Sequence, residues 1–211
     1  MELSPLQTIL DIAIAAGTIG AVIVALFGQA FRAKFFPPKL TISLADESGE
    51  STILSIPPAQ GSNEATRIAE ARFYHLRVTN TRRWSPATDT RIVLLQSEEP
   101  GPDGRLQVRW TGDIPLAWRH NSVFPPFRVV GPDAYADLCS VVNGSWMQLH
   151  TLAKPVTLNT IRSEASTIVL SLQAQSTQAS SAPLRLRISW DGLFEKGAQE
   201  MQKHLTIKEE K

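Results

Sequence analysis

The chain has 211 residues, enough for one ordinary domain with an additional segment, and its hydrophobic fraction of 43% and charged fraction of 19% exclude a disordered chain. Its formal net charge of +1 leaves no basic footprint, so a nucleic-acid partner is not expected. The single cysteine, Cys139, excludes an intramolecular disulfide, and the four histidines show no metal-ligand spacing, so neither a metal nor a cofactor is expected.

The first predicted element is an apolar helix. Residues 12–31 carry no charge, and at the helical rise this run measures about 30 Å, the thickness of a bilayer's hydrocarbon core. Pro37-Pro38 cannot continue the helix and marks its end. The sequence therefore predicts a transmembrane anchor over residues 1–36, and a buried core helix or a cleaved signal peptide are the alternatives.

Charged residues beside this helix predict its orientation. Arg32, Lys34 and Lys39 follow the apolar run, and short basic flanks remain on the cytoplasmic side of a membrane. We expect a single-pass protein of the inner cell membrane, with its N-terminus outside and its C-terminal domain in the cytoplasm.

Small residues line one face of the same helix. Ala13, Gly17, Ala21 and Ala25 are each four residues apart, a spacing that lets two helix backbones approach closely. We expect the helix to self-associate or to pair with another membrane protein, so the expected partners are the lipid bilayer and a protein. The alternative is that Ala and Gly are simply frequent in such helices.

Alternating apolar and polar residues follow the double proline, and this pattern predicts short strands. Asn143-Gly144 is a strong signal for a tight hairpin. Many short strands at this spacing are typical of an antiparallel sandwich or barrel, here over residues 37–192. The predicted strands cover residues 40–44, 52–56, 72–80, 89–96, 106–110, 127–130, 135–142, 146–150, 167–174 and 184–190.

The C-terminal segment, residues 193–211, changes to a helical period. Phe194, Ala198, Met201 and Leu205 recur at helical spacing. They predict a short amphipathic helix over Leu193–Leu205 that packs on the sandwich, with a frayed tail from residue 208. A helix lying on a membrane surface is the alternative.

One stretch of the β domain resembles a recurring pattern of immunoglobulin-like sandwich modules. A strand ending in Val78-Thr79-Asn80 is followed, after a loop, by Ala87 and an alternating strand over 91–95. The resemblance covers about twenty residues and implies a fold type, an antiparallel immunoglobulin-like β-sandwich, rather than an activity. The order of one helix before a β domain also resembles bacterial membrane-anchored proteins.

Catalytic signatures are absent from the sequence, which has no GxSxG, P-loop, GxGxxG or HExxH motif. Cys139 lies in an alternating strand, where a buried structural cysteine is expected. His75 and His120 could meet Asp89 or Asp113 in space, but the sequence alone does not bring them together. We therefore predict no catalytic residue and no enzyme activity.

Arginine is concentrated in residues 67–128, which hold ten arginines, no lysine and three tryptophans. Arg82, Arg83 and Trp84 stand where the immunoglobulin-like pattern has a simple glycine turn. Two guanidinium groups beside an aromatic ring suit the recognition of an anion or of a protein partner. These three residues are the candidate binding site, and the alternative is that the arginines occupy solvated strand faces.

Three function classes fit these observations. The first is a membrane-tethered β-sandwich binding or scaffold module that presents a partner-binding surface at the cytoplasmic face of the membrane. The second is a single-pass membrane effector that senses a nucleotide or lipid headgroup and oligomerises through its helix, for example in bacterial defence. The third is an enzyme whose site carries no recognisable motif. The absent catalytic motifs and the neutral domain favour the first.

Overall fold

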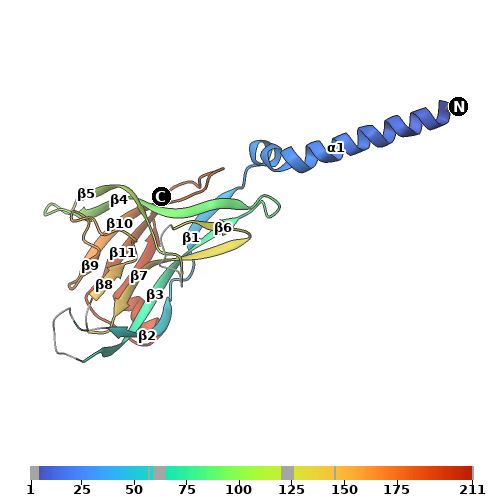
Figure 1. Ribbon diagram of the computed structural model, residues 1–211. Helices are drawn as coiled ribbons and strands as arrows, with labels where there is room; N and C mark the ends of the chain where they lie inside the picture. The colour runs from blue at the N-terminus through green and yellow to red at the C-terminus, as the bar shows by residue number, and fades with distance from the viewer. Residues whose placement is uncertain (1–4, 57, 59–64, 120–125, 145, 211) are drawn as a thin grey trace.

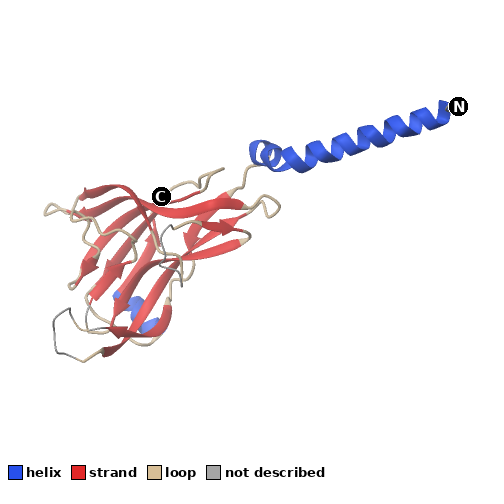
Figure 2. Cartoon of the chain, viewed as in Figure 1, coloured by secondary structure: helices blue, strands red, loops and turns tan. Residues whose placement is uncertain are grey.

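A computed structural model describes residues 5–56, 58, 65–119, 126–144 and 146–210. The protein is mainly β, with 52% of its residues in strands that form two sheets. A long helix, α1 (Pro5–Phe35), precedes the sheets and extends away from them (Figure 1). Figure 2 shows the strands in red and a short helix in blue, at the end of the β domain that lies opposite α1.

Each sheet has six strands, and all the pairings are antiparallel. The first sheet has the order β1-β3-β7-β8-β9, with β2 also paired to β3, and the second has the order β12-β11-β10-β4-β5, with β6 also paired to β4. The first sheet consists of β1 (Leu40–Leu44), β2 (Glu50–Ile56), β3 (Arg67–Asn80), β7 (Asp133–Val142), β8 (Trp146–Leu149) and β9 (Ile161–Arg162). The second consists of β4 (Ala87–Pro100), β5 (Leu106–Pro115), β6 (Arg128–Val130), β10 (Ser166–Gln175), β11 (Leu184–Trp190) and β12 (Leu205–Glu209).

The ten strands predicted from alternation all coincide with strands of the structure, and β9 and β12 are additional. The predicted hairpin at Asn143-Gly144 is confirmed, because β7 and β8 pair antiparallel on either side of it. Gly144 has a φ of 63°, in the left-handed region that glycine adopts without a steric cost. Residue 145, in the same connection, lies outside the described residues.

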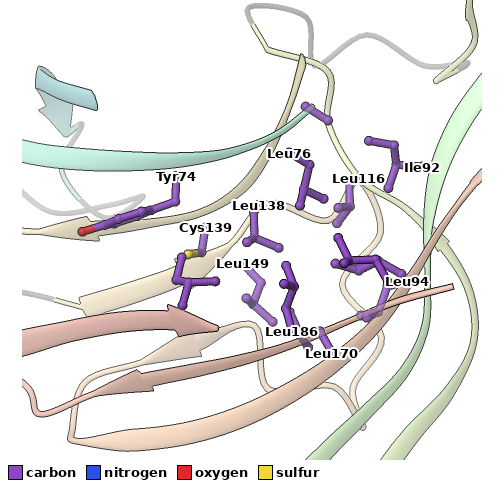
Figure 3. Packing of buried hydrophobic residues seen from close by; sticks show 14 of the residues in the cluster. Tyr74, Leu76, Ile92, Leu94, Leu116, Leu138, Cys139, Leu149, Leu170 and Leu186 are labelled. Atoms are coloured by element: carbon purple, nitrogen blue, oxygen red, sulfur yellow. The ribbon is translucent and has the colours of Figure 1, made fainter. Parts of the chain in front are cut away.

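The hydrophobic core lies between the two sheets, and side chains from both contribute to it (Figure 3). In β11 the side chains alternate strictly between buried and half-buried positions, because successive side chains of a strand point to opposite faces. Leu138 and Leu149 of the first sheet meet Leu170 and Leu186 of the second, and all four are at most 1% exposed. Burying such side chains supplies the main driving force for folding.

A β-bulge interrupts the alternation of β7. Tyr74 of β3 pairs with Cys139, but the next residue, His75, pairs with Asp137, so Leu138 has no opposite residue. Leu138 and Cys139 are consequently both buried in succession. The bulge thereby resets which residues of β7 face outward.

The C-terminal segment differs from its prediction. The helix α2 covers only Ala198–His204, with Met201 buried beneath it, and Leu205 already has extended backbone angles. The chain then continues as β12, paired with β11, where a frayed tail was expected. Leu205 and Ile207 explain the difference, because they bury alternate positions on the core.

The prediction of a transmembrane anchor is wrong, and the fold class is corrected with it. Within the described part of the chain, no helix combines the length and the apolar character that a bilayer crossing requires. The one candidate stretch among the described residues, residues 9–25 of α1, does not meet these requirements. The single-pass membrane assignment is withdrawn, and the location and topology inferred from the flanking charges stay untested predictions.

Candidate functional site

The outer face of the first sheet carries a polar cluster. Phe73 and His75 occupy positions of β3 between buried neighbours, so both point away from the core. The bulge in β7 places Asp137 opposite His75 and Ser140 opposite Phe73. At the start of β2, Glu50 pairs with Phe73 on the other side of β3. Strands β2, β3 and β7 lie side by side (Figure 1), and their pairing places these residues next to one another.

These residues line a half-open pocket of about 210 Å³. Its wall contains five polar or charged side chains together with two apolar ones. We call this the outer pocket, and its lining residues are Glu50, Thr52, Leu54, Phe73, His75, Arg119 and Asp137.

The charged groups of the outer pocket form one connected network. His75 Nδ1 lies 2.9 Å from Asp137 Oδ1, and His75 Nε2 lies 3.6 Å from Glu50 Oε2. The same Glu50 carboxylate also pairs with the guanidinium of Arg119. The side chains of His75 and Asp137 are 11% and 16% exposed, whereas Glu50 is 53% exposed. Glu50 is therefore the most accessible group of the network.

Arg119 reaches the pocket because the segment after β5 runs beside β7. Trp118 forms an isolated bridge to Ala136, and the Arg119 N–H donates to the Tyr135 carbonyl at 3.0 Å. Trp118 is 2% exposed, and its indole N–H donates to the Pro126 carbonyl at 2.8 Å. The buried indole fixes the backbone from which Arg119 extends.

Aromatic rings form the other side of the cluster. Phe73 stacks on His75 with a centroid separation of 6.4 Å and on His150 at 5.1 Å. His150 Nε2 lies 2.9 Å from the Ser140 hydroxyl. Burial lowers the pKa of His150, and the Asp137 charge opposes this only in part. His150 is therefore neutral at physiological pH.

The cluster contains a histidine and a carboxylate, as many enzyme active sites do, but no nucleophilic side chain among the described residues is hydrogen-bonded to that histidine. Asp137 can fix the tautomer of His75 as it would for a general base. Among the described residues, no serine, threonine or cysteine is hydrogen-bonded to His75. Ser140 does contact His150, but Ser140 is only 2% exposed and a substrate cannot reach it. Within the part of the chain that the structure describes, therefore, no accessible nucleophile is hydrogen-bonded to His75.

The predicted site, Arg82-Arg83-Trp84, lies in the turn between β3 and β4, and none of its three residues lines the outer pocket. Ser85 N–H donates to the Arg82 carbonyl at 2.9 Å, which closes the turn. Trp84 is 66% exposed and Arg83 is exposed. Arg82 differs, because its guanidinium donates to the Pro37 carbonyl at 2.9 Å and so fixes the connection from α1 to β1. Anion or partner binding by this turn stays a prediction, carried by Arg83 and Trp84.

The four small residues of the predicted stripe on α1 are all exposed. Ala13, Gly17, Ala21 and Ala25 lie four residues apart on the helix, and a Cβ built on Gly17 would meet nothing within 4 Å among the described atoms. The stripe is thus open for contact, and its role in helix pairing stays a prediction.

The sequence offered Asp89 and Asp113 as carboxylates that His75 could meet in space, without bringing them together. The structure pairs His75 with Asp137 instead; His120 lies outside the described residues. Asp137 could have been identified as the partner only from the pairing of β3 with β7, because the bulge shifts the register of these two strands. The expectation for Cys139 is confirmed, since it is fully buried and burial raises the pKa of its thiol to about 12.

Comparison with known proteins yields no relative, because neither a protein-family model nor a curated protein matches the chain. The resemblance to immunoglobulin-like modules consequently stays a prediction.

Proposed function

We propose that the protein is a non-catalytic β-sandwich binding module that recognises a cationic group of its partner, such as a lysine or arginine side chain, in the outer pocket. The observation that carries this proposal is the pair of carboxylates, Glu50 and Asp137, that converge on His75. The proposal keeps the first of the three function classes without its membrane tether.

Charge favours a cation in this pocket. Glu50 and Asp137 contribute two negative charges, and Arg119 contributes one positive charge. Apart from His75, the lining has a formal charge of −1, which a cationic group would balance. Glu50 is half exposed, so it can accept a further hydrogen bond from a ligand without leaving Arg119.

The apolar part of the lining suits the stem of a long basic side chain. Leu54 and Phe73 are both half-buried and lie beside the carboxylates. Lysine and arginine place their methylene stems on apolar surface while the charged head stays at a polar group. A volume of about 210 Å³ suits one side chain better than a complete cofactor, because pockets for drug-sized ligands start at about 300 Å³.

The first prediction concerns the charge of the ligand. In an NMR titration of the full chain, N-acetyl-lysine amide is expected to shift the Phe73 and His75 resonances saturably, and the neutral N-acetyl-norleucine amide is not. Glu50→Gln should lower the affinity for the lysine probe by about tenfold, because it removes one charge-assisted contact. Arg119→Met should raise this affinity, because the lining then becomes more negative.

The matched control is Glu164→Gln, which removes an exposed carboxylate outside the pocket. It should leave the affinity unchanged. Equal binding of the lysine and norleucine probes would show that the pocket does not select charge, and so would an Arg119→Met variant that binds the cation more weakly.

We also propose that the protein self-associates through α1. This helix exposes large apolar side chains on every side, and each of those that follow is at least 50% exposed. They are Ile9, Leu10, Ile12, Ile14, Ile19, Val22, Ile23, Val24 and Phe27. Exposed apolar surface of this extent favours association in water, and small residues let the helix axes come close.

The second prediction tests this association. Sedimentation velocity of the full chain should show oligomers whose fraction rises with concentration. Ala21→Leu should lower that fraction, because a larger side chain in the stripe keeps the helices apart. Ala15→Leu, the same change on the other side of the helix, is the control. Equal effects of the two variants, or a monomer at every concentration, would contradict the proposal.

A further inference from the structure

Two strands at the rims of the two sheets have open edges. Among the described strands, β1 pairs with β3 alone and β12 pairs with β11 alone. The residues that flank β1 continue its pairing. The Thr81 N–H donates to the Lys39 carbonyl at 3.0 Å, and the Ala45 N–H donates to the His75 carbonyl at 2.9 Å. Since bonding positions alternate in an antiparallel pair, Leu40, Ile42 and Leu44 direct their N–H and C=O groups away from the sheet.

The same alternation applies to β12. Asp191 N–H donates to the His204 carbonyl at 3.0 Å, and Glu210 N–H donates to the Arg185 carbonyl at 2.9 Å. The even-numbered residues of β12 therefore face β11. The N–H and C=O groups of Ile207 are directed outward at the edge of the second sheet.

The two sheets are offset at this side of the sandwich. β1, the last strand of the first sheet, packs against β10, whereas the second sheet continues from β10 to β11 and β12. Two hollows of about 440 and 580 Å³ follow the edge of β1. The first lies between residues 38–42 and 180–184, and the second lies between residues 44–47 and 207–209. Together they form what we call the β1–β12 groove.

The dimensions and lining of the groove suit one additional strand. Five residues of β1 measure about 17 Å, the length of a typical short strand. Ile42 and Leu44 are only partly buried although they pack against the core. An extended segment beside β1 would pair with its outward N–H and C=O groups and would cover these two side chains, as in strand addition to an open edge.

Charge distinguishes the two ends of the groove. Asp46, Glu47 and Glu209 surround one end with a single lysine, Lys208, whereas Lys39 is the one charged residue that lines the other end. Hydrogen bonds from the Ser48 side chain and backbone lower the pKa of Asp46, so its carboxylate keeps its charge. A segment that binds here gains from a basic residue at the Asp46 end.

We infer that the β1–β12 groove binds an extended peptide segment of a partner protein, which adds to β1 as a strand. The segment carries apolar side chains at alternate positions and a basic residue at the end near Asp46, Glu47 and Glu209. This inference concerns a different face from the outer pocket and does not depend on the proposed function.

Fluorescence anisotropy with a labelled hexapeptide, Lys-Val-Thr-Val-Thr-Val, tests the inference on the full chain. Ile42→Pro removes an N–H that faces the groove without removing a bond to β3. It is expected to weaken binding at least tenfold. Ile42→Ala keeps the N–H and loses only side-chain contact, so it should weaken binding by less.

A second pair of changes keeps the test decisive if Ile42→Pro lowers the melting temperature. The double variant Glu47→Lys with Glu209→Lys reverses the acidic end of the groove, and both residues are exposed. It should reverse the preference, so that Glu-Val-Thr-Val-Thr-Val binds more tightly than the lysine peptide.

Three results would overturn the inference. One is equal binding by the parent and by a folded Ile42→Pro variant. Another is an unchanged preference for the lysine peptide after charge reversal. The third is a parent protein that dimerises and becomes monomeric with Ile42→Pro, because the occupant of the groove is then a second copy of the chain.

Discussion

Replacing Arg72 with methionine is expected to lower the free energy of unfolding by about 3 kcal/mol, because it leaves three partly buried carbonyl acceptors without their donor. Arg72 is only 4% exposed. Its guanidinium donates to the carbonyls of Ser48 at 2.8 Å, Gly49 at 3.0 Å and Lys196 at 2.6 Å. One side chain thus joins the β1–β2 turn to the segment before α2. Methionine has a similar apolar volume but offers no donor.

Urea denaturation of the full chain measures this effect. The control is Arg77→Met, the same change five residues along β3, where the arginine is 45% exposed and pairs with Asp133 at 2.8 Å. A solvent-exposed ion pair contributes little, so this variant should unfold close to the parent. Similar midpoints for the two variants would show that the contacts of Arg72 are not structural.

Replacing Leu138 with alanine is expected to lower the free energy of unfolding by about 3 kcal/mol, within the range of about 2–5 kcal/mol for buried leucine truncations. Leu138 is fully buried in the core between the sheets (Figure 3). It also occupies the bulge of β7, where its carbonyl accepts a hydrogen bond from His150 N–H at 3.0 Å. The surrounding strands cannot collapse onto the cavity, because both sheets hold their register through hydrogen bonds.

The same denaturation experiment measures this loss. Leu193→Ala is the matched control, since Leu193 is 57% exposed and its truncation should change stability by less than about 0.5 kcal/mol. A Leu138→Ala variant as stable as the Leu193→Ala variant would contradict the assignment of Leu138 to the core.

Most of the strands of this protein could be predicted from local patterns in the amino-acid sequence. Alternation is a local property, since a strand that buries one face must place an apolar residue at every second position. For that reason the segments around Leu40, Ile92 and Leu186 could be predicted without knowing their partners. The hairpin at Asn143-Gly144 is equally local, because the turn chemistry is contained in two residues.

The strand pairings, and with them the candidate sites, depend on contacts between distant segments and could be obtained from the tertiary structure alone. His75 and Asp137 are 62 residues apart in the sequence, and a bulge in β7 sets their register. Arg72 occupies a strand position like that of many solvated arginines, and it is buried only because the turn at Ser48 and the segment at Lys196 close over it. The outer pocket and the β1–β12 groove both depend on such contacts between distant segments, which a local pattern does not contain.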